Sequence, residues 1–166
     1  IEEIRSLKDP RLLVSVDQEG GNVQRFRHSF TKLPSFSKIG EIHQINPNLG
    51  KKIAAEHACI MVEELRSIGV DLSFTPVVDI GNKNSKVLKD RTFSENPNIV
   101  AELALLYTQT MKKNGMIAVA KHFPGHGGEA KIPTFSFQLI NANYLRYGST
   151  IFCRTGSLLK MICERL

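Results

Sequence analysis

The chain has 166 residues, of which 42% are hydrophobic and 23% are charged. This ordinary globular composition argues against a disordered chain, and no apolar run approaches the roughly 20 residues that a membrane-spanning helix needs. The net charge of +6 is not interleaved with aromatic residues in any recognisable nucleic-acid-binding motif, so we expect neither a nucleic-acid partner nor a membrane partner.

The cysteines indicate the compartment. Cys59, Cys153 and Cys163 lack the paired spacing of zinc sites and redox motifs. An odd number of cysteines, in a chain that opens with no charged-then-apolar leader, favours reduced thiols, so we expect a cytoplasmic protein. Residues 1–8 read as the end of a helix, and we expect further sequence before them.

The first half of the chain predicts a strand, a long loop and a helix. Residues 11–17 (RLLVSVD) form a nearly continuous apolar run, as expected of a parallel strand buried on both faces, and a polar loop over 18–35 follows. A helix is predicted over 47–67, since Pro47 suits a first helical position and Gly69 suits the left-handed position beyond the end. Its expected buried stripe is Ala54, Ala58, Met61, Leu65 and Ile68.

The next segments repeat this order. A strand is predicted over 70–80, followed by a polar loop, and Asn96-Pro97 marks a helix start. The helix closes at Asn114-Gly115, and residues 116–123 form a third strand. The expected buried stripe of this helix is Val100, Leu103, Tyr107 and Met111.

Strands that alternate with helices of this length imply right-handed βαβ units and a parallel sheet. Apolar runs that end in polar residues are typical of a (β/α)₈ barrel, whose active sites collect at the carboxyl ends of its strands. We therefore predict an α/β fold, a partial (β/α)₈ TIM barrel of about three βα units, with an irregular C-terminal tail. Three strands of an open barrel should leave two unpaired edges and one uncovered face.

Charged and polar residues follow each predicted strand at the edge where a barrel builds its site. In chain order they are Asp17, Glu19, Arg25, Asp79, Asp90, Arg91, Lys121, His122 and His126. Carboxylates and cations that converge on one barrel mouth can bind the hydroxyl groups of a polyol, at roughly 1.5–3 kcal/mol for each charged hydrogen bond. This arrangement suits a sugar.

Each of these residues also has a plainer interpretation. Asp17 could cap a turn, and Arg91 could be a solvated loop charge. His122 and His126 are four residues apart, but Pro124 and Gly125 between them exclude the helix that would place such a pair on one face. We therefore expect no metal site and no other cofactor.

The same segments carry a resemblance to a known family. VDQEGGNVQRFR, LPS, VDLSFTPVVDI, DRTFSENP and AVAKHFPGHG resemble, in this order and spacing, the family-3 glycoside hydrolases. Within that family they resemble the bacterial β-N-acetylglucosaminidases (β-hexosaminidases) of cell-wall recycling. The resemblance implies a (β/α)₈ barrel and a cytoplasmic, retaining enzyme that removes terminal non-reducing β-linked N-acetylglucosamine from muropeptide-type saccharides. It also implies substrate-binding roles for Asp17, Arg25, Arg91, Lys121 and His122.

The departures from the family pattern concern catalysis. After KHFPGHG the family continues to Asp-Ser-His, whose His is the general acid/base, and this sequence contains no Asp-Ser-His. The family's nucleophilic Asp lies on a later strand than the three predicted here, and its first strand should precede Ile1. We therefore expect no catalytic residue in this chain and predict an inactive fragment. A non-catalytic sugar-binding remnant and one half of a split enzyme are the alternatives, and a barrel enzyme acting on phosphorylated substrates is weaker.

The pattern changes after Gly127. We divide the chain into a partial family-3 barrel domain over 1–127 and a non-family tail over 128–166. Residues 131–134 (KIPT) can be encoded by AAG ATT CCC ACN, and if the codon of Ala130 ends in A, a shifted frame reads Lys-Asp-Ser-His. We therefore predict that the tail is a frameshifted product.

Overall fold

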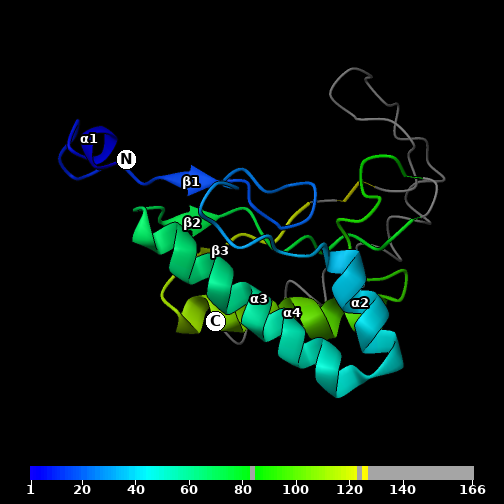
Figure 1. Ribbon diagram of the computed structural model, residues 1–166. Helices are drawn as coiled ribbons and strands as arrows, with labels where there is room; N and C mark the ends of the chain where they lie inside the picture. The colour runs from blue at the N-terminus through cyan, green and yellow to red at the C-terminus, as the bar shows by residue number, and fades with distance from the viewer. Residues whose placement is uncertain (83–84, 123–124, 127–166) are drawn as a thin grey trace, which may run out of the picture.

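The computed structural model describes residues 1–82, 85–122 and 125–126 (Figure 1). Its elements are, in chain order, α1 (Glu2–Arg5), β1 (Ser15–Val16), α2 (Phe36–Ile45), α3 (Pro47–Ser67), β2 (Leu72–Ser73), α4 (Pro97–Lys113) and β3 (Ile117–Ala118). The tail over 128–166 lies outside the described residues, so its irregular character and its origin stay predictions. No helix in the described part is long and apolar enough to cross a membrane.

The three strands form one parallel sheet in the order β1-β2-β3. The chain passes through α2 and α3 between β1 and β2, and through α4 between β2 and β3, so helical crossovers join neighbouring parallel strands. The predicted α/β class and parallel sheet are thus confirmed. In the described residues β1 and β3 each pair with β2 alone, as expected of an open sheet, and closure into a barrel stays a prediction.

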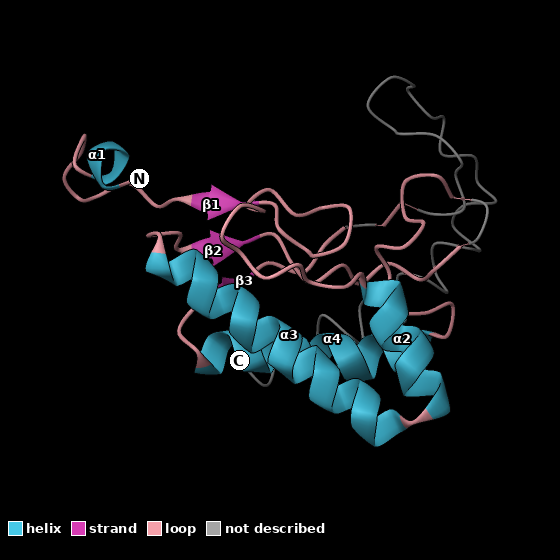
Figure 2. Ribbon diagram, viewed as in Figure 1, coloured by secondary structure: helices cyan, strands magenta, loops and turns pink. Residues whose placement is uncertain are grey.

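Helices cover one face of the sheet (Figure 2). Val16, Ser73 and Ala118 are cross-strand neighbours on the covered face. On the opposite face Ile117 is 59% exposed and Leu13 is 66% exposed. The prediction that strands are buried on both faces is therefore wrong at these positions, because no described element packs against that face.

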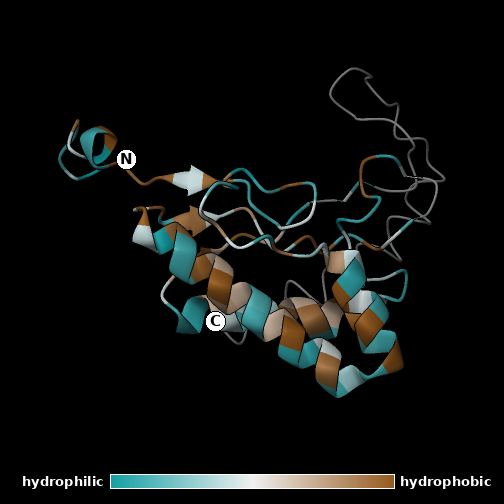
Figure 3. Ribbon diagram, viewed as in Figure 1, coloured by the Kyte–Doolittle hydropathy of each residue, from teal (hydrophilic) through white to brown (hydrophobic). Residues whose placement is uncertain are grey.

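Helices α3 and α4 begin and end where the sequence predicts. The side chains of Asn46 and Asn96 each accept a hydrogen bond from an N–H of the first helical turn, and a proline follows each. Beyond the helix ends, Gly69 has a φ of 85° and Gly115 a φ of 79°. The predicted stripes are buried except at Ile68, which is partly buried, and Figure 3 shows hydrophobic and hydrophilic residues alternating along both helices.

Helix α2 is the element that the sequence analysis missed, since Gly40 weakens its helical pattern. Packing requires that glycine: a Cβ on Gly40 would lie 1.6 Å from the carbonyl oxygen of Phe93. The rings of Phe36 and Phe93 stack with centroids 4.4 Å apart, and Ile39 is fully buried. Through these contacts α2 holds the loop that carries Arg91.

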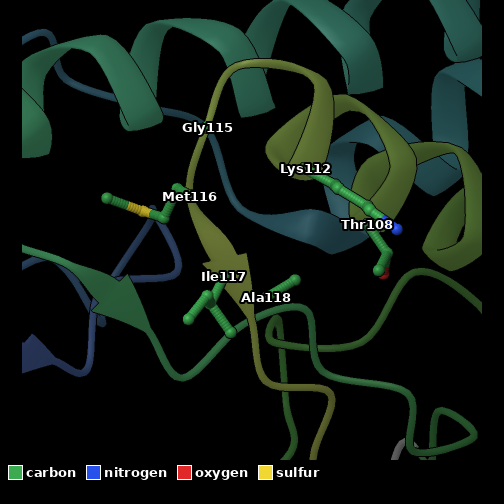
Figure 4. A pocket seen from close by; sticks show the side chains of 6 residues that line it. All are labelled: Thr108, Lys112, Gly115, Met116, Ile117 and Ala118. Atoms are coloured by element: carbon green, nitrogen blue, oxygen red, sulfur yellow. The ribbon is translucent and has the colours of Figure 1, made fainter. Parts of the chain in front are cut away.

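A hollow of about 400 Å³ opens beside β3 at the end of α4 (Figure 4). Its lining residues are Thr108, Lys112, Gly115, Met116, Ile117 and Ala118. Much of this lining is apolar, and it adjoins the strand edge that has no partner among the described residues. Apolar surface, including Ile117 at 59% exposure, is therefore open to solvent here.

Candidate saccharide-binding site

The loops that follow the three strands lie at the same end of the sheet (Figure 1), and Lys121 joins two of them. Its Nζ lies 2.6 Å from Oε1 of Glu19 and forms a second ion pair with Asp17. Lys121 follows β3, whereas both carboxylates follow β1, so the contact spans the end of β2. The predicted convergence of strand ends is therefore observed for these residues.

Glu19 is the anchor of this cluster. Its carboxylate accepts two hydrogen bonds from Arg91, from Nε at 2.9 Å and from Nη2 at 2.7 Å, in addition to the contact with Lys121. Glu19 is 2% exposed, so its charge is compensated inside the protein rather than by water. The hydrogen bonds that Arg91 donates to Glu19 raise the pKa of Arg91, which keeps its guanidinium charged.

Asp17 is more open than Glu19. Its side chain is 37% exposed, and Arg25, which is 59% exposed, approaches it at 3.4 Å. Burial alone would raise the pKa of Asp17, but the hydrogen bond and positive charge of Lys121 outweigh it, so the pKa is lowered. An ionised and accessible carboxylate beside two or more cations can accept hydrogen bonds from a bound hydroxyl group.

A second cluster surrounds Asp79, at the end of the second predicted strand. Its carboxylate accepts from Nδ1 of His122 at 2.6 Å, from the backbone N–H of His122 at 3.1 Å and from that of His126 at 2.8 Å. Burial would raise the pKa of Asp79, but these hydrogen bonds lower it below the ordinary value. The peptide bond between Lys121 and His122 is cis.

The two clusters adjoin. The ring of His122 meets that of His126 edge to face, with centroids 4.2 Å apart. The pKa of His126 is lowered, mainly by burial and by the neighbouring His122, and Arg91 and Lys121 also contribute. The negative charge of Asp79, in turn, contributes to the raised pKa of Arg91.

The loop after β1 is held by a buried histidine of α3. Nε2 of His57 lies 3.1 Å from the carbonyl oxygen of Pro34, and Nδ1 lies 2.9 Å from the hydroxyl of Tyr107. Gly20 has a φ of 95°, and a Cβ there would lie 2.6 Å from the Pro34 oxygen and 2.7 Å from His57 Nε2. Gly20 therefore permits a close contact between this loop, Pro34 and His57.

The structure thus brings together Asp17, Arg25, Arg91 and Lys121, and places His122 next to them. Glu19 and Asp79 were predicted among the strand-end polar groups, but the family resemblance gave them no substrate-binding role. The carboxylate of Asp90, another of the predicted strand-end groups, accepts a hydrogen bond from the side chain of Asn22. In the part of the chain that the structure describes, no group of three or more His, Cys, Asp or Glu side chains is arranged to hold a metal ion.

Comparisons with known proteins identify the family of this chain. The family model of the glycosyl hydrolase family 3 N terminal domain matches residues 2–133. A β-hexosaminidase of Thioalkalivibrio sulfidiphilus is 50% identical over 128 residues, which are 77% of this chain and 37% of the relative. A β-hexosaminidase of Nitrosomonas eutropha is 48% identical over 124 residues, which are 75% of this chain and 36% of the relative.

Solved structures give the same result. Native NagZ from Neisseria gonorrhoeae matches with a TM-score of 0.73 and 42% identity, over 76% of this chain and 38% of that chain. The same protein in complex with N-trifluoroacetyl-D-glucosamine matches equally well. The chain therefore spans a little over a third of the length of these relatives.

Proposed function

The chain belongs to glycosyl hydrolase family 3 as an N-terminal part of a β-hexosaminidase, and we propose that it forms a wall of a saccharide site for terminal β-linked N-acetylglucosamine. The observation that carries the proposal is the cluster of Asp17, Glu19, Arg91 and Lys121 at one end of the sheet. In the whole protein this wall would serve a retaining glycosidase.

The cluster has the chemistry that a sugar needs. A hydroxyl group both donates and accepts, so it binds best between a fixed cation and a fixed acceptor. Lys121 and Arg91 can only donate hydrogen bonds, whereas the ionised carboxylate of Asp17 can only accept them. Glu19 already pairs with Arg91 and Lys121 and so holds both side chains in place before a ligand arrives. This reduces the entropy cost of ordering them when a ligand binds.

The ligand class is supported by a relative. NagZ of Neisseria gonorrhoeae has been crystallised with N-trifluoroacetyl-D-glucosamine, a derivative of the proposed sugar. We propose for this chain a muropeptide-type saccharide, met in the cytoplasm during peptidoglycan recycling.

We further propose that this chain binds the sugar without hydrolysing it. A retaining glycosidase uses two carboxyl groups about 5–5.5 Å apart, one as acid/base and one as nucleophile. The carboxylates of Asp17, Glu19 and Asp79 are already engaged by cations or N–H groups. The family's Asp-Ser-His is absent from the sequence.

The test measures binding and hydrolysis separately on the purified chain. Chemical-shift titration with N-acetylglucosamine should give weak, saturable binding that Asp17→Ala abolishes and that Asp9→Ala, at an exposed position, leaves intact. No chromogen should be released from a nitrophenyl N-acetyl-β-glucosaminide. Absence of binding would refute the saccharide site, and turnover by the chain would refute its inactivity.

A second candidate is one half of a split enzyme. The observation that favours it is the edge of β3, which has no strand partner among the described residues and where Ile117 is 59% exposed beside the hollow of Figure 4. Co-expression with a polypeptide carrying the later βα units of a full-length relative should then give a stable complex with glycosidase activity. Failure to co-purify would remove this candidate.

A further inference from the structure

Asp79 is nearly sealed inside the protein, at 3% side-chain exposure, and among the described residues its two oxygens accept hydrogen bonds only from His122 and His126. Oδ2 accepts from the backbone and the ring of His122, and Oδ1 accepts from the backbone of His126. One buried carboxylate therefore fixes the backbone N–H groups of His122 and His126 and the orientation of the His122 imidazole.

The contact also fixes which ring nitrogen carries the proton. An ionised carboxylate can only accept, so Nδ1 of His122, at 2.6 Å, must be the donor. In a neutral imidazole the other nitrogen is then an acceptor. Nε2 of His122 has no hydrogen-bond partner among the described residues, and the side chain is 28% exposed, so this acceptor is available to a ligand.

We propose that Asp79 is a positioning residue of the saccharide site: it holds a proton on Nδ1 of His122 and thereby leaves Nε2 as a hydrogen-bond acceptor for a saccharide hydroxyl. The proposal rests on the saccharide-binding function proposed above. The proposed arrangement gives the site both hydrogen-bond donors and a hydrogen-bond acceptor for one sugar hydroxyl. Arg91 and Lys121 only donate, so a hydroxyl that accepts from either cation still needs a place for its own proton, and Nε2 provides one.

The experiment reads the ring directly. Two-bond ¹H–¹⁵N spectra of the full chain at mildly alkaline pH distinguish the two neutral tautomers, and a His122→Asn variant identifies the His122 signals among the five histidines. In the wild-type chain we expect the Nδ1–H form of His122 to predominate by at least about tenfold, because its hydrogen bond to Asp79 is charge-assisted. Finding the Nε2–H form instead would overturn the proposal, and this reading needs no sugar.

Two variants test what the tautomer does. In Asp79→Asn one acceptor oxygen must replace two, so the population should move toward Nε2–H and N-acetylglucosamine should bind at least about tenfold more weakly. The matched control is Asp71→Asn: Asp71 is also a largely buried carboxylate, 13% exposed, but it accepts hydrogen bonds from Arg5, Arg11 and the N–H of Val14 at the other end of the strands. This control should leave both the tautomer and the affinity unchanged.

His122→Asn is the second variant, and it serves even if Asp79→Asn does not fold. Its side-chain amide keeps a donor for Asp79 but removes the Nε2 acceptor, so binding should weaken by a similar factor while the segment stays in place. Unchanged affinity in this variant would refute the acceptor role. If the wild-type ring is in the Nδ1–H form but no variant or wild-type chain binds the sugar, the saccharide function fails and the positioning role of Asp79 stands.

Discussion

Replacing Glu19 by Gln tests whether the buried anchor, rather than the exposed charges, holds the site together. The substitution keeps the size of the side chain and removes the charge that Arg91 and Lys121 share. Both cations are largely buried, at 18% and 14% side-chain exposure. Removing one partner of a buried ion pair costs about 3–5 kcal/mol. Since the amide of Gln retains one acceptor oxygen, we expect the lower end, about 3 kcal/mol.

The assay is urea unfolding followed by circular dichroism, with Arg25→Gln as the matched control. Arg25 is 59% exposed and lies 3.4 Å from Asp17, so losing this surface pair should cost less than about 1 kcal/mol. A free energy of unfolding that falls equally in both variants would show that Glu19 is no anchor. A large loss at Glu19 alone supports the buried network.

Three further outcomes are expected. Burial lowers the pKa of His57 from 6.5 to about 4, so the unfolded chain binds the proton first on acidification. The free energy of unfolding should therefore fall by about 3 kcal/mol as the pH is lowered through the interval between these two pKa values. Urea titrations at several pH values should show this loss in the wild-type chain and not in His57→Gln. Gly40→Ala should lower the melting temperature, since its Cβ would lie 1.6 Å from the oxygen of Phe93; it should cost at least about 2 kcal/mol, against about 0.5 or less for exposed Gln109→Ala. Genomic DNA read beyond the codon of His126 should show Asp-Ser-His in a shifted frame, and a single clean frame without family-like sequence would contradict the frameshift.

Two helices could be predicted from the sequence because their signals are local. Asn46 and Asn96 accept hydrogen bonds from the turns that follow them, and the glycines after each helix adopt positive φ. Helix α2 gave no such signal. The helix is stabilised instead by a contact more than fifty residues away, where Gly40 lets it approach the backbone of Phe93.

The site divides in the same way. Its residue types and their order along the chain were sufficient to predict a cluster containing Asp17, Arg91 and Lys121. The sequence could not distinguish Asp17 from Glu19, since both follow the same strand two residues apart. Only packing does so: Glu19 is 2% exposed and bonds two cations, whereas the side chain of Asp17 is 37% exposed.

The position of the cluster depends on a polar residue inside a strand. Ser73 of β2 is fully buried, and its hydroxyl donates to the carbonyl oxygen of Gln18 at 3.0 Å. That bond connects β2 to Gln18, the residue between Asp17 and Glu19, the two carboxylates that Lys121 contacts. A valine, which buried parallel strands prefer, would remove the bond and leave the Gln18 carbonyl without this donor. The residue that weakens the strand pattern is therefore one that the site requires.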